Sequence, residues 1–206
     1  MARPLLLIVL LLLQACGGGR LVALPEDADQ SDRERRAISR RIEDLSVTVE
    51  AEAWRAGPRR LTDDLLPFLV RIANRTRGEV TLRLAELSLI DDSGRSYSPL
   101  RPEEVISLLL GGSDLLDFVP SIQIEASGPE PTIFGLELGV NFDLDRDLRD
   151  IRGLAFPPEP LPPGSRAEGF IYFPRPLLGA RRLTVILVLD APSGRLQLPI
   201  SYAIEK

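Results

Sequence analysis

The stretch Leu45-Ser46-Val47-Thr48-Val49-Glu50-Ala51-Glu52-Ala53 decides the fold, because its apolar and polar residues alternate without a break. Successive side chains of a β-strand point to opposite faces, so this period of two gives one apolar and one polar face. The pattern predicts a half-buried strand that begins at Leu45 and ends near Trp54.

The same alternation returns on both sides of short turns. Residues 68–74 predict a second and more central strand, and residues 80–84 a third. The inward register of the third strand shifts at Leu87, which suggests a bulge or a bend near Ala85-Glu86. Residues 91–94 form a tight turn, and three further strands are predicted over residues 167–173, 183–190 and 196–204. Many short strands joined by short turns are typical of antiparallel β-structure, so we predict an all-β sandwich over residues 45–206.

The middle of the chain differs from this pattern. Pro102-Glu103-Glu104 predicts a helix start, Gly111-Gly112 ends that helix, and Val105, Leu108 and Leu109 are expected to face the core. Helical spacing over residues 143–152 predicts a second short helix, whereas residues 132–142 and the Ile122–Ile124 pair predict strands. We interpret residues 102–153 as an insertion that carries one or two short helices.

The amino-acid composition excludes the residues that most catalytic mechanisms require. The 206 residues contain no histidine and one cysteine, so the commonest general base, the commonest metal ligand and an intrachain disulfide are all missing. The count of 25 Lys+Arg against 30 Asp+Glu gives a net charge of -5, which argues against a nucleic-acid partner. We therefore expect no enzyme activity, no cofactor and no metal site.

The N-terminus has the pattern of a secretory leader, residues 1–15. Arg3 supplies a positive charge, and an unbroken apolar run from Leu5 to Leu13 is too short to span a bilayer permanently. The run ends in Leu13-Gln14-Ala15-Cys16, which resembles the lipobox of bacterial lipoproteins. A plain secretory peptide with a chance cysteine is the alternative.

Resemblance to bacterial lipoproteins implies that Cys16 becomes the first mature residue and carries a diacylglycerol thioether and an acylated amine, such as a palmitate. Several acyl chains anchor a protein firmly to a membrane. Gly17 follows Cys16, in place of the aspartate that often retains lipoproteins in the inner membrane. The resemblance therefore implies a periplasmic protein anchored to the outer membrane.

Residues 16–44 are predicted to be the lipidated cysteine and a tether of about 30 Å root-mean-square length. Ala37, Ile38, Ile42 and Leu45 have helix-compatible spacing, so a short helix is expected over residues 33–44. The arginines of this segment either form a solvated face with the interspersed acids or contact anionic headgroups near the anchor.

Three motifs resemble small bacterial immunoglobulin-like (telokin-like) envelope domains. They are the strand-Asn-turn of residues 68–76, the hairpin Leu89-Ile90-Asp91-Asp92-Ser93-Gly94-Arg95-Ser96-Tyr97, and the strand entry from Leu161-Pro162-Pro163-Gly164 to Phe173. The resemblance implies an immunoglobulin-like sandwich and supplies no catalytic residue.

Few other residues suggest chemistry. Asp143, Asp145, Asp147 and Asp150 form an acidic run, but intervening arginines and helical spacing favour a solvated helix over a Ca²⁺ site. Asp63-Asp64 and Asp91-Asp92 are interpreted as turn caps, and the Asn74-Arg75-Thr76 sequon as chance. The apolar residues 106–116 are either the buried side of the inserted helix or a partly exposed lip that binds a partner.

We therefore predict a lipid-anchored, non-enzymatic binding or structural module of the cell envelope, with an unidentified envelope protein or glycan as its partner. The alternatives are a carboxylate-dependent enzyme that acts on glycans and an accessory protein for secretion or assembly that captures an extended peptide on a sheet edge.

Overall fold

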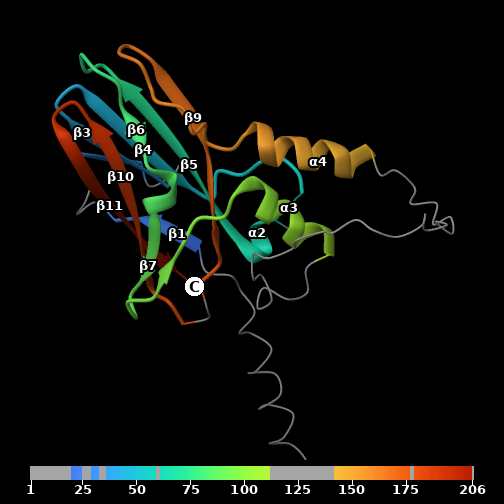
Figure 1. The fold of residues 1–206 in the computed structure, drawn as a ribbon. Helices are drawn as coiled ribbons and strands as arrows, with labels where there is room; N and C mark the ends of the chain where they lie inside the picture. Colours follow the sequence, from blue (N-terminus) through green and yellow to red (C-terminus); the bar gives the residue numbers. More distant parts are fainter. Residues whose placement is uncertain are drawn as a thin grey trace, which may run out of the picture.

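The computed structural model describes residues 20–24, 29–32, 36–58, 61–111, 142–176 and 179–205. These residues form two antiparallel sheets that pack face to face, with three helices gathered beside one end of the sandwich (Figure 1). The predicted all-β antiparallel sandwich with short helices is therefore confirmed.

The first sheet has the strand order β1-β11-β10-β7-β8, and β6 also pairs with β10. Its centre is the long β10–β11 hairpin, which the sequence predicts from its two alternating segments and the turn between them. The bounds are β1 Arg20–Ala23, β6 Thr81–Leu82, β7 Ser88–Asp91, β8 Ser96–Tyr97, β10 Arg182–Ala191 and β11 Gly194–Glu205.

The second sheet has the strand order β2-β3-β4-β5-β9. Its centre is β4, the strand that the alternation beginning at Leu45 predicts, and β5 beside it is buried along most of its length. The bounds are β2 Gln30–Asp32, β3 Ala37–Ile42, β4 Leu45–Ala51, β5 Leu65–Asn74 and β9 Arg166–Pro174.

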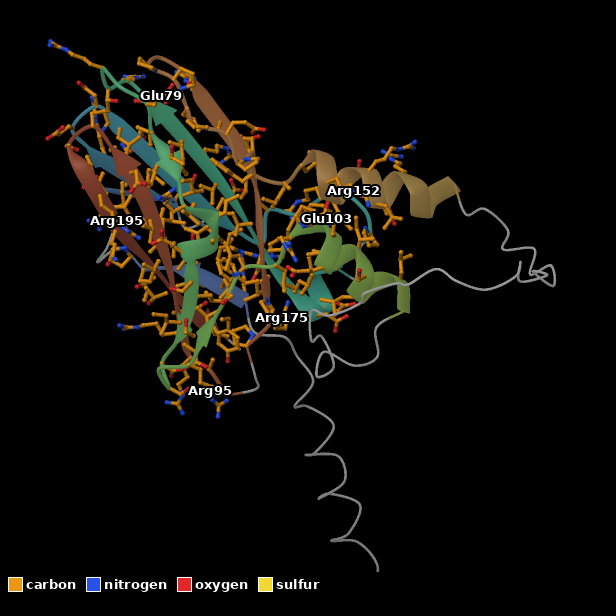
Figure 2. All side chains as sticks on the ribbon, in the orientation of Figure 1. Glu79, Arg95, Glu103, Arg152, Arg175 and Arg195 are labelled. Carbon is orange, nitrogen blue, oxygen red and sulfur yellow. The ribbon has the colours of Figure 1, made fainter. Side chains whose placement is uncertain are left out.

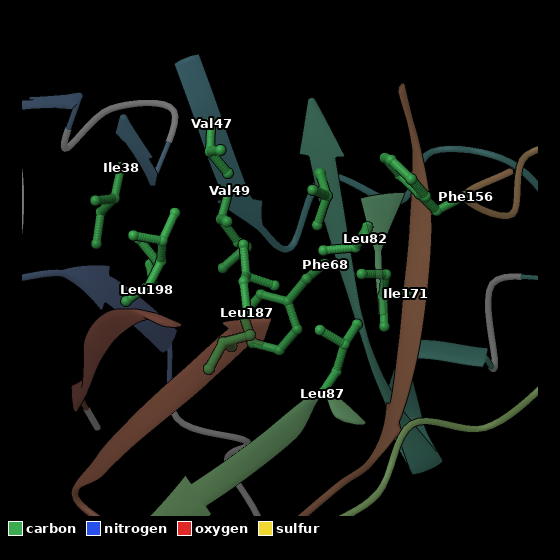
Figure 3. Close-up of a cluster of buried hydrophobic side chains, with 14 of the residues drawn as sticks. Ile38, Val47, Val49, Phe68, Leu82, Leu87, Phe156, Ile171, Leu187 and Leu198 are labelled. Carbon is green, nitrogen blue, oxygen red and sulfur yellow. The ribbon is translucent and has the colours of Figure 1, made fainter. Parts of the chain in front are cut away.

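The main core fills the space between the two sheets (Figure 3). Alternate residues of each strand enter it, such as Val47 and Val49 of β4 facing Leu187 of β10. Tyr202 of β11 crosses the core and its hydroxyl donates a hydrogen bond of 2.9 Å to the carbonyl of Val49. Each large apolar side chain removed from water contributes about 1.5–3 kcal/mol, so this interface dominates the stability of the sandwich.

Of the bulge or bend predicted near Ala85-Glu86, the structure shows a bend. Leu84–Glu86 form one turn of 3-10 helix, η2, between β6 and β7. The turn lets Leu82 and Leu87 both face the core, although an unbroken strand would place residues five apart on opposite faces.

The helix predicted over residues 33–44 is wrong. Residues 37–42 form β3, which pairs with β4 from Ala37 opposite Glu50 to Ile42 opposite Leu45 through a two-residue turn. β1 and β2 also lie within the sheets, and the first described strand begins at Arg20. The segment predicted to be a tether is therefore part of the sandwich over these strands.

Three helices cover part of the outer face of the second sheet. They are α2 Leu61–Asp64, α3 Pro102–Gly111 and α4 Phe142–Gly153, and the last two confirm the helices predicted for the middle of the chain. They enclose a second apolar cluster with β5 and β9, in which Trp54 packs edge-on against Phe170. The strands predicted over residues 132–142 and at Ile122–Ile124 lie outside the described residues, apart from Phe142, which begins α4.

Candidate functional site

The segments before α3 and after α4 both form backbone hydrogen bonds to the edge strand β9. On the entry side, the amide of Leu100 donates to the carbonyl of Tyr172 at 2.7 Å. On the exit side, the amide of Phe156 donates to the carbonyl of Phe170 at 2.9 Å, and the amide of Phe170 donates to the carbonyl of Leu154 at 2.7 Å. The β9 edge is therefore closed at Phe170 and Tyr172 by the segments that lead into α3 and out of α4.

Gly169 makes this closure sterically feasible. A Cβ atom at Gly169 would lie 2.3 Å from the Cα of Phe156 and 2.5 Å from its nitrogen. Atoms that are not bonded to each other do not come this close, so the exit segment approaches β9 only because residue 169 has no side chain. This close approach gives a structural reason for the glycine in the strand-entry motif.

A cleft of about 840 Å³ lies between these segments and η2. Its apolar lining comes from Leu100, Phe156, Phe170, Ile171 and Tyr172, and its charged lining from Arg101, Glu103, Glu104, Arg152 and Glu159. A mostly apolar cleft with a few polar groups at its margin is the usual form of a ligand site.

The charged groups of the cleft are largely paired with one another. The Arg101 guanidinium lies 3.0 Å from Glu104, whose carboxylate also accepts the amide of Arg101 at 2.7 Å. Burial of Glu104 acts to raise its pKa, but these hydrogen bonds and the charge of Arg101 outweigh it and lower the pKa below the usual value. Glu103 lies 3.9 Å from Arg152 and links α3 to α4.

Tyr172 contributes to the cleft through its ring, because its hydroxyl is already engaged. That hydroxyl donates a hydrogen bond of 2.9 Å to the carbonyl of Ile151, near the end of α4. Burial, followed by the nearby charge of Asp150, raises the pKa of Tyr172 well above its ordinary value. The phenol therefore stays protonated and is a structural clamp between β9 and α4.

The residues that the sequence suggested for chemistry do not gather at this cleft. Of the acidic run, the side chains of Asp147 and Asp150 are described, and those of Asp143 and Asp145 are not. No group of three or more potential metal ligands occurs among the side chains that the structure describes. Asp63 and Asp64 lie in α2 and not in a loop, which corrects that interpretation.

Asp91 acts as the predicted turn cap. Its carboxylate accepts the amides of Ser93 and Arg95 and the hydroxyls of Ser93 and Tyr97, at 2.6–3.0 Å. The hydroxyl of Ser93 is the largest influence, and together these bonds lower the pKa of Asp91 against the opposing effect of burial. The hairpin motif is thus explained by turn geometry.

Asn74 is fully buried and joins three segments. Its amide nitrogen donates to the carbonyls of Gly78 and Leu161, each at 2.8 Å, and its oxygen accepts from the amide and hydroxyl of Thr76. With both amide atoms engaged in the interior, Asn74 is a structural residue in the folded protein.

The described part of the apolar residues 106–116 supports both earlier interpretations, a buried helix side and a partly exposed lip. Val105 and Ile106 are buried in the second apolar cluster, with Leu108 and Leu109 packed against it, as predicted for the core side of the helix. Leu110 is 53% exposed, and residues 112–116 lie outside the described part of the chain.

Cys16 also lies outside the described residues. In the part of the chain that is described, no helix has the length and apolar character needed to cross a membrane. Comparisons with protein-family models, with curated proteins and with solved structures found no match. The cleft residues come from four segments that are far apart in the sequence. Phe170 and Tyr172 belong to the strand-entry motif and Glu103 to the predicted helix start, but no sequence signal indicates that these segments meet.

Proposed function

We propose that this protein is a lipid-anchored, non-enzymatic binding module of the cell envelope, held by Cys16 and located on the periplasmic side of the outer membrane. The cleft beside α3 and α4 is its binding site. The observation that carries the binding function is this cleft of about 840 Å³, with its apolar lining and paired charges.

The anchor rests on the leader and the lipobox-like sequence. Replacing Cys16 with Ser and fractionating cells tests it. Wild-type protein is expected in the detergent phase of membrane extracts, and the variant is expected to lose that partitioning. If the variant partitions like wild type, the anchor assignment is wrong.

The chemistry of the cleft indicates what its ligand offers. Leu84, Leu100 and Pro157 line the cleft and are half-buried, so they offer it apolar surface, whereas the rings of Phe156, Phe170 and Tyr172 lie buried beneath. The ligand therefore contributes an apolar group to this lining. Arg101 and Glu103 at the margin orient polar groups of either sign. An apolar segment of an envelope protein meets these requirements.

The cleft function is tested by filling the cleft. Ala85 lines it and is exposed, so Ala85→Trp adds a bulky group there without disturbing the core. Crosslinking pull-down from membranes is expected to recover the same partner with wild type and with Arg77→Trp, an exposed turn control. Ala85→Trp is expected to lose that partner, and equal recovery would refute the cleft as the site.

The enzymatic alternative has one specific observation in its favour. Glu103, Glu104 and Glu159 all line the cleft, as a carboxylate-dependent glycosidase requires of its two acids. Such an enzyme also needs a carboxyl with a raised pKa as its general acid, whereas Arg101 lowers the pKa of Glu104. Turnover of an envelope glycan that Glu159→Gln abolishes would favour the enzyme over the binding module.

The peptide-capture alternative would use a sheet edge. The edge strands are β1 and β8 in one sheet and β2 and β9 in the other. Because β9 is already bonded at Phe170 and Tyr172, capture on that strand would first have to displace the segments around Leu100 and Ala155.

A further inference from the structure

The position of β1 fixes how far the fold can lie from the anchor. β1 begins at Arg20 and pairs with the last strand, with Arg20 opposite Glu205. Four residue steps separate Cys16 from Arg20, and even a fully extended chain covers at most about 14 Å in that span. An anchor at Cys16 therefore keeps this end of the sandwich close to the bilayer surface.

Three arginines meet at this end, and we call Arg20, Arg36 and Arg55 the arginine cluster. Glu52 joins them to the fold, since its carboxylate accepts the amide of Leu21 at 2.7 Å and forms an ion pair with Arg36. Arg55 donates hydrogen bonds to the carbonyls of Glu52 at 2.8 Å and Trp54 at 3.0 Å. Among the described residues its contacts are with backbone oxygens, and no carboxylate there forms an ion pair with it.

Positive charge in the cluster is only partly balanced. Burial of Arg36, and then the charges of Arg20 and Arg55, lower the pKa of its guanidinium. The Nε atom of Arg36 is buried without a hydrogen-bond partner among the described residues. Arg20 and Arg55 are exposed, so an approaching anion can reach the cluster through them.

The backbone that holds the cluster is strained. Arg36 and Glu52 both adopt left-handed conformations, with φ of 54° and 53°, which residues other than glycine rarely adopt. Strain of this kind persists where the surrounding structure requires it and is frequent at functional sites. Here it places the ion pair of Arg36 and Glu52 beside the start of β1.

Other arginines lie at the same ends of the strands. Arg182 begins β10 opposite Ala203, and the carbonyl of Arg181 accepts the amide of Ile204. Arg95 lies in the β7–β8 turn, far from Glu79 at the opposite end of the sandwich (Figure 2). Two acids in this region are already engaged, since Asp91 caps its own turn and Asp92 accepts the amide of Arg181. Glu205 lies opposite Arg20 in the β1–β11 register and offsets part of its charge.

We propose that the arginine cluster binds the phosphate groups of anionic phospholipids, so that this end of the sandwich docks on the membrane that carries the Cys16 anchor. The inference rests on the proposed anchor, because the short span from Cys16 to Arg20 brings the cluster to the headgroups. Guanidinium groups bind phosphate oxygens through two parallel hydrogen bonds, and each basic residue near an anionic surface strengthens docking about fivefold.

The test uses the full-length lipidated protein, reconstituted into vesicles of phosphatidylcholine alone or of phosphatidylcholine with phosphatidylglycerol. Flotation on a density gradient measures anchoring. Modification of arginines by phenylglyoxal, mapped by mass spectrometry, measures docking. We expect flotation with both vesicles, but protection of Arg20 and Arg55 only with the anionic ones, with exposed Arg77 at the far end unprotected in both.

Arg55→Gln is expected to float normally and to reduce the protection of Arg20 about fivefold, and Arg77→Gln is the matched control that leaves it unchanged. Flotation with equal modification on both vesicle types would overturn the docking and leave the anchor intact. Loss of flotation would overturn the anchor and, with it, the docking. Equal protection by inorganic phosphate in detergent would show a site for free anions and would also overturn the proposal.

Discussion

Asn74 gives the sharpest test of how the sandwich is held together, because one buried amide joins the end of β5 to two other segments. Replacing Asn74 with Ala removes five hydrogen bonds of 2.7–3.2 Å, to Gly78, Leu161, Pro162 and Thr76. Each such bond contributes about 1 kcal/mol net. The carbonyls of Gly78 and Leu161 keep other partners, namely the Thr76 hydroxyl and the Val80 amide, so the expected loss is about 3 kcal/mol.

Asn74→Asp separates this account from simple loss of packing. The carboxylate can still accept from Thr76, but it turns an oxygen toward the carbonyls of Gly78 and Leu161. Its pKa in the folded state is therefore raised above the unfolded value of about 3.9, so the variant is most stable at low pH and loses stability as pH rises through that window.

Urea unfolding at pH 7 and at pH 4 measures both effects. At pH 7 we expect Asn74→Asp to be less stable than Asn74→Ala, and the gap to close at the lower pH. Arg75→Ala, an exposed residue of the same turn, is the control and should change stability by less than about 0.5 kcal/mol. A loss below about 1 kcal/mol for Asn74→Ala would refute the joining role.

Two further predictions concern the cleft and the β7–β8 turn. Gly169→Ala should force the exit segment away from β9 and break two backbone hydrogen bonds, so the free energy of unfolding in urea should fall by at least about 2 kcal/mol. Gly153→Ala is the control, because a Cβ there meets nothing within 4 Å and should leave the stability unchanged. Similar stabilities of the two variants would contradict the close approach. Asp91→Asn should be less stable than wild type at neutral pH, and the difference should shrink as the pH falls below about 4. The lowered pKa of Asp91 stabilises the folded state above the unfolded pKa, and acidification removes that stabilisation. A difference in unfolding midpoint that does not change with pH would contradict this role of Asp91.

Alternation predicted the strands that bury one clear face. β4 and the β10–β11 hairpin follow it closely, because each presents apolar residues to the core at every second position. The sequence did not predict β3, because Arg40 interrupts the alternation between Ile38 and Ile42. The remaining apolar positions then also fit helical spacing. Pairing with β4 settles the conformation, and that information lies in a neighbouring strand.

β1 and the cleft were missed for related reasons. β1 buries only Leu21 and Ala23, which is too short a pattern to distinguish from a tether. The cleft exists because β9 brings Leu100 and Phe156 together across the helical segment. The alternation of apolar residues shows which side chains share one face of a strand, but it does not show which segments lie beside that strand.

The corrected start of the fold changes the role of the N-terminus. A long tether would let the domain stand clear of the bilayer, whereas β1, which begins at Arg20, leaves at most four residue steps between the sandwich and Cys16. With the proposed anchor at Cys16, the candidate cleft and the arginine cluster would be held at a fixed place relative to the membrane, which suits the proposed module.

The central proposal is the lipid anchor at Cys16, and the most direct measurement is the intact mass of the protein extracted from membranes, with fragmentation of its N-terminal peptide. The account predicts a chain that begins at Cys16 and carries a diacylglyceryl group and an amide-linked acyl chain. An unmodified Cys16, whether in a chain cut elsewhere or in an uncut chain, would contradict it.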